Sequence, residues 1–585
     1  MRLSLGMLLR LLGLPAKADP GGSQLDNDRN SLIARLRGVV GHRNVLSDAN
    51  TTLPYRTGYR IGAGDVLAVA KPGSLVELWR TAELCAACDV IMIVQAANTG
   101  LTGGSTPYGS YDRPVVVIST LRIDAVIPIL GGTQSICLAG STLTLLEERL
   151  RTSGRVPHSV IGSSCIGASV IGGICNNSGG ALVGRGPAFT RFALFARVNA
   201  QGRLELVNNL GLAIGDDPFS ILSALDRGEV ADAKIENPQQ EACLSDYETH
   251  VRNISAVSPA RYNADSRCHF EAAGSAGKVI IFAVRVDSYP AAKSTATFLL
   301  TTDNAQDLAD FRHHVLGSFR TLPVTAEYLH REAARTAATH GNDICVAIRH
   351  LGAARVPLLF AVKRHIDRIL RRFGLFGRSP ADHILQAIGS VAPHPLPRSI
   401  RKLADQCEHM LLVTVADEGI REARSYIGVH QDSSLSAHQC SSVEADALQR
   451  LRFATAGAMV RYCDVEAAAG PLVAIDCALP RNARDWQISL PSGLAGQVLI
   501  SAAYGHFLCH VFHLDFVLKP GCDPVQFENT LVQKLHSMGV ECPAEHNFGH
   551  HYQAPENVVD FYRSLDPTNS LNPGIGKTSK SKFWN

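Results

Sequence analysis

Two glycine-rich segments contain the residues best suited to hold a ligand through the main chain. The first, Gln95–Pro107, directly follows a strand-like stretch, and the second is Gly162–Gly180. Small residues let successive backbone N–H groups approach an anion, and nearby hydroxyls add donors. The pattern is not GxGxxG, and no acidic residue is placed to bind a ribose, which argues against a nicotinamide site. Together the segments favour a bound dinucleotide, although sheet-on-helix packing would explain any single glycine.

Histidines and a carboxylate gather near the C-terminus. His506, His510 and His513 lie within one short stretch, and Glu545 and His546 follow. Histidines with a carboxylate can bind a metal. An imidazole, with an ordinary pKa near 6.5, can also act as a general base at neutral pH. Each histidine taken alone is more simply explained as a hydrogen-bonded core or surface residue.

The surrounding sequence predicts an α+β protein that positions these groups. Strand-like runs at 66–69, 90–95 and 115–119 alternate with a helical run at 75–88, and a further helix is expected at 307–319. The 585 residues are 46% hydrophobic and 19% charged, with a net charge of +3. This composition excludes a disordered chain and a strongly basic nucleic-acid protein. No stretch is apolar enough to span a membrane.

One segment is strongly basic. Between Arg355 and Lys402 there are ten Lys and Arg residues against two acids, interleaved with large apolar residues. This pattern favours a helix lying on an anionic membrane surface, where each cation contributes about 1 kcal/mol. A solvated basic helix and a nucleic-acid patch are the alternatives, and no nucleic-acid motif accompanies the segment.

The N-terminus and the cysteines allow several interpretations. The first residues combine leucines with Arg2 and Arg10, which is compatible with an export signal, an amphipathic membrane-surface segment or an over-extended start. The fifteen cysteines are scattered, which favours reduced thiols over a disulfide framework. The pair Cys85 and Cys88 is expected to belong to the core.

Several motifs together resemble one known family. They are Gln95–Pro107, Pro157–Gly180, Arg261–Asp265, Ala544–Asn547 and Asp566–Lys577. These runs resemble the quinone-dependent, FAD-containing respiratory D-lactate dehydrogenases, a family within the vanillyl-alcohol-oxidase or PCMH-type FAD-binding superfamily. The resemblance extends from about Leu32 to the C-terminus.

The resemblance implies a two-part FAD-binding domain, a mixed α/β cap domain and a basic helical region that contacts the membrane. The expected boundaries are an N-terminal extension at 1–29, the first FAD-binding part at 30–285, the cap at 286–345 and 405–519, the basic membrane-binding region at 346–404, and the second FAD-binding part at 520–585. The residues expected to hold FAD are Ala96, Ala97, Asn98, Thr99, Gly100, Gly104, Ser105, Gly162, Ser169, Gly179 and Ile281. Flavinylated relatives carry a histidine in the first loop and this chain does not, so FAD is expected to be non-covalent.

The implied reaction is oxidation of D-lactate to pyruvate, with electrons passing through FAD to ubiquinone at an anionic membrane surface. His546 is the expected base, and Glu545, His506 and His513 are expected to orient it or hold substrate. Arg461 and Arg481 are the candidates for binding the substrate carboxylate. Relatives hold a divalent metal with similar groups, but the usual Gly-Asp-Gly-Asn turn between the two histidines is absent, so metal binding stays open.

The expected location is peripheral, on the cytoplasmic face of the bacterial inner membrane, with no nucleic-acid partner. The alternatives are a soluble FAD-dependent dehydrogenase for another D-2-hydroxy acid, and a non-catalytic membrane-binding protein that keeps the fold.

Overall fold

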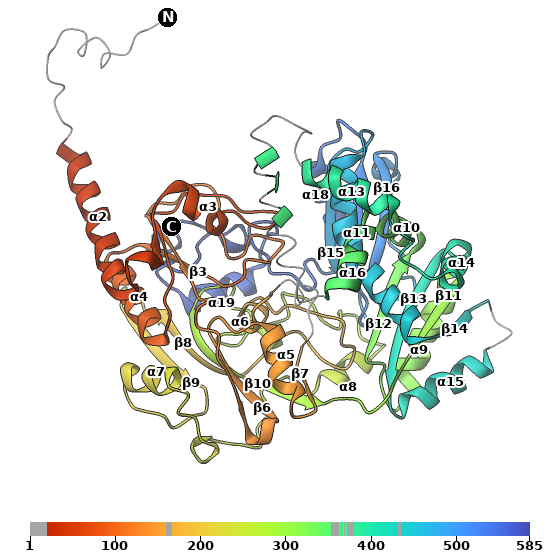
Figure 1. Ribbon diagram of the computed structural model, residues 1–585, viewed down its shortest axis with the longest axis horizontal. Helices are drawn as coiled ribbons and strands as arrows, with labels where there is room; N and C mark the ends of the chain where they lie inside the picture. The colour runs from red at the N-terminus through yellow and green to blue at the C-terminus, as the bar shows by residue number, and fades with distance from the viewer. Residues whose placement is uncertain are drawn as a thin grey trace, which may run out of the picture.

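Three sheets organise the chain (Figure 1). The computed structural model describes residues 20–159, 167–352, 362–363, 366–367, 369–370, 380–430 and 434–585. The predicted α+β architecture is confirmed, because parallel and antiparallel sheets alternate with helices along the chain. Within the described residues, every helix is too short or too polar to cross a bilayer.

The first sheet is small and mostly parallel. Its strands in spatial order are β1 (Val45–Leu46), β2 (Ala68–Ala70), β4 (Val115–Ser119) and β3 (Ile91–Gln95). Helices α2 (Pro20–Val40), α3 (Ala49–Arg56) and α4 (Leu75–Ala87) accompany it. Leu32, Leu36 and Val40 are buried at four-residue spacing, so one face of α2 joins the core. The helix begins at Pro20, inside the segment 1–29 that was expected to be an extension.

The second sheet is antiparallel and shares a hydrophobic core with the first. Its strands in order are β5 (Val126–Ile129), β6 (Gln134–Leu138), β10 (Ile280–Pro290), β8 (Phe192–Val198) and β9 (Leu204–Asn209), and β7 (Arg155–Pro157) pairs with β10. The helices that join this core are α5 (Leu143–Arg151), α6 (Val170–Cys175) and α7 (Pro218–Asp226), whereas α8 (Tyr247–Arg252) packs on α9 and joins the core of the third sheet. The shared core supports our proposal that residues up to about 290 form one unit.

The third sheet has seven antiparallel strands and lies beside the first two (Figure 1). Its order is β14 (Ser436–Cys440), β11 (Thr295–Thr302), β13 (His409–Ala416), β12 (Thr325–His330), β16 (Val498–His506), β17 (Val511–Leu518) and β15 (Leu472–Ala478). Phe298 and Leu300 of β11 join one core and Leu299 joins another, so both faces of the sheet are covered.

Helices cover both faces of this third sheet. They are α9 (Ala305–Ser318), α10 (Arg331–His340), α11 (Asn342–Leu351), α13 (Pro380–Val391), α14 (Arg398–Gln406), α15 (Gly419–Val429), α16 (Ser442–Val465), α17 (Ser492–Ala495) and α18 (Pro524–Ser537). Because α18 packs on β15, we propose that the cap extends beyond residue 519, rather than ending there as expected.

Much of the predicted basic region lies outside the described residues, including Arg355, Arg364, Arg368, Arg371, Arg372 and Arg378. The described part includes α14, where Arg398, Arg401 and Lys402 are exposed while Ile400 packs into the core. The pair Cys85 and Cys88 fits the predicted core role, since Cys85 is buried and Cys88 half-buried at the end of α4.

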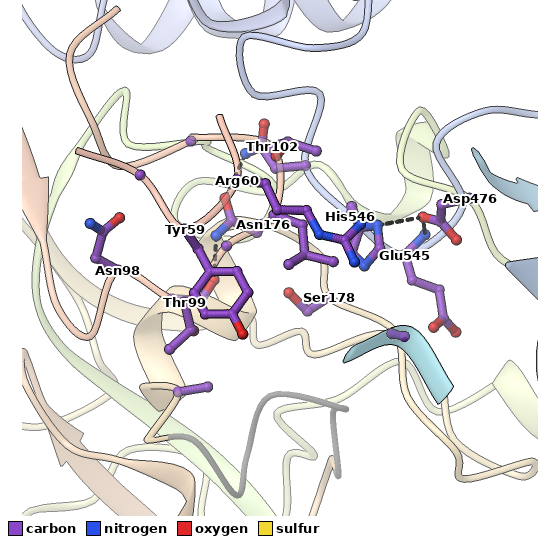
Figure 2. Close-up of a pocket in the computed structure, with 18 of the residues that line it drawn as sticks. Tyr59, Arg60, Asn98, Thr99, Thr102, Asn176, Ser178, Asp476, Glu545 and His546 are labelled. Atoms are coloured by element: carbon purple, nitrogen blue, oxygen red, sulfur yellow. Dashed lines mark hydrogen bonds and ion pairs between the residues drawn. The ribbon is translucent and has the colours of Figure 1, made fainter. Parts of the chain in front are cut away.

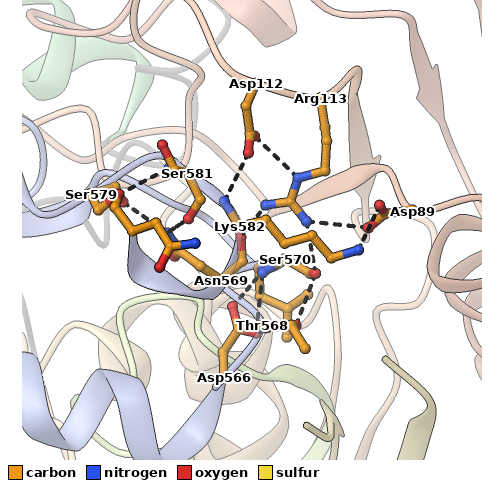
Figure 3. Close-up of polar contacts among 12 residues, drawn as sticks. Asp89, Asp112, Arg113, Asp566, Thr568, Asn569, Ser570, Ser579, Ser581 and Lys582 are labelled. Carbon is orange, nitrogen blue, oxygen red and sulfur yellow. Dashed lines mark hydrogen bonds and ion pairs between the residues drawn. The ribbon is translucent and has the colours of Figure 1, made fainter. Parts of the chain in front are cut away.

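The C-terminal segment closes back onto the first sheet. After α19 (Glu556–Leu565), Leu571 forms a parallel bridge with Met92 on the free edge of β3. The fully buried carboxylate of Asp566 accepts hydrogen bonds from Thr568, from the Ser570 N–H and from the Leu571 N–H, as Figure 3 shows in part. Arg113, next to β4, donates to the Asn569 carbonyl and the Ser570 hydroxyl. Both ends of the chain therefore build the same unit.

We expect Asp566→Ala to destabilise this closure. The change leaves buried N–H donors without an acceptor and removes the charge that most strongly opposes the burial-induced fall in the pKa of Lys278, at a cost of about 3 kcal/mol or more. The midpoint of thermal unfolding should fall clearly. The matched control is Asp560→Ala at an exposed position of α19, which should change stability by less than about 0.5 kcal/mol. Equal unfolding midpoints for the two variants would contradict this role of Asp566.

Candidate active site

A large cavity lies between the glycine loops and the third sheet. Its volume is about 2140 Å³, whereas pockets for one small ligand measure roughly 300–1,000 Å³. It is lined by parts of 53–61, 94–105, 168–181, α16, the strands β15 to β17, and 545–547. Figure 2 shows Asn98 and Thr99 at one end and Asp476 and Glu545 at the other. The cavity therefore has room for an extended cofactor and a further small molecule.

The predicted phosphate loop faces this cavity. All seven of its candidate residues line the cavity: Ala96, Ala97, Asn98, Thr99, Gly100, Gly104 and Ser105. The Gln95 amide donates to the carbonyls of Tyr55 and Ser105, which closes the base of the loop. A Cβ added at Gly100 would meet no atom within 4 Å. The main chain there borders open space, so the loop fits a bound phosphate group.

The second glycine-rich segment contributes a different feature. Ser169 and Gly179 line the cavity, as does Ile281 on β10, while Gly162 lies outside the described residues. A Cβ at Gly179 would overlap the carboxylate of Glu545. Gly179 is therefore required in order to admit Glu545 into the site.

A charged chain of side chains crosses the site. Arg261 Nη2 lies 2.5 Å from Glu545 Oε1, and the other oxygen of Glu545 lies 3.1 Å from His506 Nε2. The opposite nitrogen of His506 lies 2.6 Å from Glu327, which also pairs with Arg452 at 2.9 Å. Burial alone would lower the pKa of His506, but the charges of Glu327 and Glu545 raise it to about 9. Burial would raise the pKa of Glu545, yet Arg261 and His506 hold it well below its usual value.

Asp476 on β15 lies beside the other two histidines of the site, His513 and His546, and orients them. One of its oxygens accepts the N–H groups of Glu545 and His546 at 2.7 and 3.0 Å, and lies 3.3 Å from His546 Nδ1. The other oxygen lies 3.5 Å from His513 Nδ1. Burial lowers the pKa of His513 to about 3, against the charges of Asp476 and Glu545, so this imidazole is neutral. The four predicted groups, His506, His513, Glu545 and His546, thus meet at one place.

Three of these groups fit a divalent metal. Ligand atoms of His506, His513 and Glu545 lie within 4.8 Å of one another. Each histidine places Nδ1 beside a carboxylate, Glu327 or Asp476, and leaves Nε2 facing Glu545 Oε2. A carboxylate behind a histidine ligand fixes the tautomer that metal binding needs. The missing Gly-Asp-Gly-Asn turn is no obstacle, because a short 3₁₀ turn at Phe507–Cys509 joins β16 and β17 and keeps both histidines on the site.

The two predicted arginines are placed differently. Arg461 lines the cavity, but its guanidinium pairs with Asp343 and Asp382. Arg481 is not among the lining residues, and it donates to the carbonyls of Ser258 and His250. The placement of Arg481 therefore argues against it as the group that binds substrate, because its donors are already used within the protein.

Sequence reasoning missed Arg60, which stands at the tip of a tight loop. The Gly58 N–H donates to the Gly62 carbonyl, and a Cβ at Gly62 would overlap Thr106 of the phosphate loop. Arg60 lines the cavity, and Figure 2 shows its side chain pointing inward toward the His546 side. Burial raises the pKa of Asp515 on β17, and the charge of Arg60 is the largest effect opposing it. The glycine spacing of 58–64 was the available signal.

Arg60 differs from the other cations of the cavity. Among the described lining residues, Lys363, Arg452 and Arg461 each pair with a carboxylate, and Arg60 does not. A free guanidinium beside a histidine and a carboxylate is suited to binding a small carboxylic acid.

The chain is similar to several known proteins. A family model described as D-lactate dehydrogenase, membrane binding, matches residues 297–584. The quinone-dependent D-lactate dehydrogenase of Haemophilus influenzae is 45% identical, over 94% of this chain and 99% of that protein. The enzymes of the same name from Escherichia coli and Corynebacterium glutamicum are 44% and 40% identical, each over 96% of this chain and 99% of theirs.

Solved structures share the fold at low identity. A p-cresol methylhydroxylase with substrate bound has a TM-score of 0.55 at 11% identity, covering 94% of this chain and 97% of that one. A 4-ethylphenol oxidase from Gulosibacter chungangensis has a TM-score of 0.54 at 13% identity, with the same coverage. These likenesses confirm the predicted PCMH-type fold.

We expect the histidine cluster to bind a divalent ion. Protein stripped with a chelator should take up Zn²⁺ or Mn²⁺, measured by elemental analysis after gel filtration. His513→Gln should weaken uptake by about tenfold or more, since even a residue behind a ligand contributes about 10–100-fold. The control His438→Gln changes a half-buried histidine elsewhere, paired with Glu444, and should retain uptake. Equal uptake by the two variants would show that the ion lies elsewhere.

Proposed function

This chain belongs to the family of quinone-dependent D-lactate dehydrogenases, and we propose that it oxidises D-lactate to pyruvate and delivers two electrons to a membrane quinone. The observation that carries this proposal is one cavity that joins the phosphate-type loop, the histidine and carboxylate cluster, and the free guanidinium of Arg60. D-lactate loses two electrons and two protons in becoming pyruvate, and a quinone gains the same number in becoming a quinol.

The cofactor we propose is FAD, bound without a covalent link. The loop 96–105 would hold its phosphates, with Ser169 and Ile281 along its length, because these residues line the cavity and the backbone at Gly100 is open to it. When bound, FAD supplies the acceptor for the hydride that leaves C2 of the substrate. None of the residues 95–107 is a histidine, which supports the non-covalent proposal.

The proposed substrate position follows from charge and proton transfer. The Arg60 guanidinium binds the carboxylate, which orients the hydroxyl-bearing carbon toward the cluster. Asp476 lies beside Nδ1 of His546 and keeps the ring proton on that nitrogen. The unprotonated Nε2 is then the atom that takes the proton of the substrate hydroxyl. A metal held by His506, His513 and Glu545 would make the substrate hydroxyl more acidic.

The family assignment and the surface together support peripheral attachment to a membrane. On α13, Ile384, Ile388 and Val391 are 43%, 53% and 84% exposed, and their spacing places them on one face. Such a face next to exposed cations suits a lipid surface, and favours the membrane enzyme over the soluble alternative. We propose anionic lipid as the partner and the cytoplasmic face of the bacterial inner membrane as the location.

A spectrum tests the proposed function. The purified chain should show the visible absorbance of oxidised flavin, released by denaturation because no covalent bond holds it. D-lactate should bleach this absorbance and L-lactate should not. A colourless protein that fails to take up added FAD would rule out the reaction.

We expect His546→Ala to retain flavin but to reduce turnover of D-lactate by about 10²–10⁴-fold, the usual contribution of a general base. Stopped-flow measurement of flavin bleaching isolates this step from later ones. The control His536→Ala changes an exposed residue of α18 and should behave like the wild type. Bleaching at the normal rate in His546→Ala would exclude it as the base.

Replacing Arg60 should affect substrate binding first. We expect Arg60→Ala to raise KM for D-lactate about 10–100-fold, the size expected for a lost charge-assisted hydrogen bond. Arg60→Lys should recover part of the loss, and binding of oxalate, a non-reacting acid, should weaken in parallel. The control Arg43→Ala removes an exposed arginine of the same unit. Unchanged oxalate affinity in Arg60→Ala would assign the carboxylate to another residue.

A further inference from the structure

One part of the cavity lies beyond the groups that the proposed reaction uses. It is bordered by α16, whose residues Phe453, Ala456 and Val460 line the cavity. Spacings of three, four and seven residues place these side chains on one face of the helix. The opposite face is buried in the core through Leu448, Leu451 and other residues. We call the space along Phe453, Ala456 and Val460 the α16 branch.

The walls of the α16 branch are apolar in the middle and polar toward both ends, where Arg452 and Arg461 line the cavity. Ile344 of α11 lies across from α16, and a Cβ at Gly457 would be 3.3 Å from its side chain. Asp382 of α13 also lines the cavity, where it pairs with Arg461 at 3.2 Å and with Lys363 at 2.6 Å. Arg461 also pairs with Asp343, so these two cations and two carboxylates compensate one another and attract no net ion. An uncharged, flat molecule with polar atoms at its edge fits this lining.

The same helices form the exposed apolar face. α11 and α13 both pack on α16. On α13, Asp382 is buried and lines the cavity, whereas Ile384, Ile388 and Val391 are exposed. At 100° per residue, these three lie roughly opposite Asp382 on the helix. One thin helical layer thus separates the α16 branch from a surface suited to lipid.

The volume leaves room for a second ligand. At about 2140 Å³ the cavity is at least twice the usual upper size of about 1,000 Å³ for a ligand pocket. Phe453, Ala456 and Val460 are not among the residues assigned to FAD or to D-lactate, so the space along them is left for another molecule.

We propose that the α16 branch binds the head group of the acceptor quinone, which enters from the lipid beside α11 and α13. This inference rests on the proposed function, because the acceptor class comes from the family. The quinone's ring packs against Phe453 and Val460, and its tail leads out past the exposed face of α13. The head group gains two electrons and two protons there, and both pairs originate from D-lactate.

Filling the branch tests this site. Ala456→Phe adds a ring to the proposed binding space, and we expect the ratio of ubiquinone-linked to dye-linked turnover with D-lactate to fall at least about tenfold. Val443→Phe adds a similar side chain at an exposed position of the same helix and should leave that ratio unchanged. Equal ratios in the two variants would overturn the proposal.

Labelling the unmodified holoenzyme gives an answer even if Ala456→Phe fails to fold. A photoreactive ubiquinone analogue should label the peptide containing residues 453–460, and excess ubiquinone should compete. Competed labelling only at other peptides would place the quinone elsewhere and overturn the proposal. Failure of D-lactate to bleach the flavin at all would instead reject the proposed function, so the two failures are distinct.

Discussion

The buried chain of alternating charges is the constraint on which the site depends. Arg261, Glu545, His506, Glu327 and Arg452 follow one another with separations of 2.5–3.1 Å. They come from five separate parts of the sequence, including a loop before β10, the segment after α18, β12, β16 and α16. Removing one partner of a buried ion pair leaves an uncompensated charge, at a cost of about 3–5 kcal/mol. The network therefore forms only when the first unit and the third sheet are docked in one arrangement.

The close approach of main chains makes that network possible. Gly179 provides the space that the Glu545 carboxylate occupies, and Gly62 allows the Arg60 loop to rest against Thr106. Asp476 then fixes the backbone of both Glu545 and His546 through a single oxygen. Gly179, which was expected to contact the cofactor, thus also positions the Glu545 carboxylate. Its substitution would disturb both cofactor and substrate groups, and a loss of activity alone would not separate the two.

Local signals predicted the elements but not the long-range partners. The strand at 115–119 was predicted with its observed bounds, and helices at 75–88 and 307–319 were predicted within two residues, because their apolar spacing is local. Arg60 was missed because its position depends on a contact between Gly58, Gly62 and Thr106 of the phosphate loop, which is more than 40 residues away in sequence. Sequence could not show the partners of Arg481 either, since its acceptors, Ser258 and His250, lie more than 200 positions away in sequence. The histidine cluster was found, but its fit to a metal depended on Glu327 and Asp476, which no spacing connects to it.

Helix α16 borders both the proposed substrate site and the proposed quinone site. Hydride transfer needs a closed, water-poor site, whereas a quinone must arrive from lipid. Arg452 belongs to the ion network and the next residue, Phe453, lines the apolar branch. Consecutive helical residues point about 100° apart, so one helix can present a charge to the substrate site and an aromatic ring to the acceptor site. Helices α11 and α13 pack on α16, beside the proposed acceptor site. Contact of these helices with the membrane therefore affects the acceptor site directly, and the loops proposed to hold FAD are not involved.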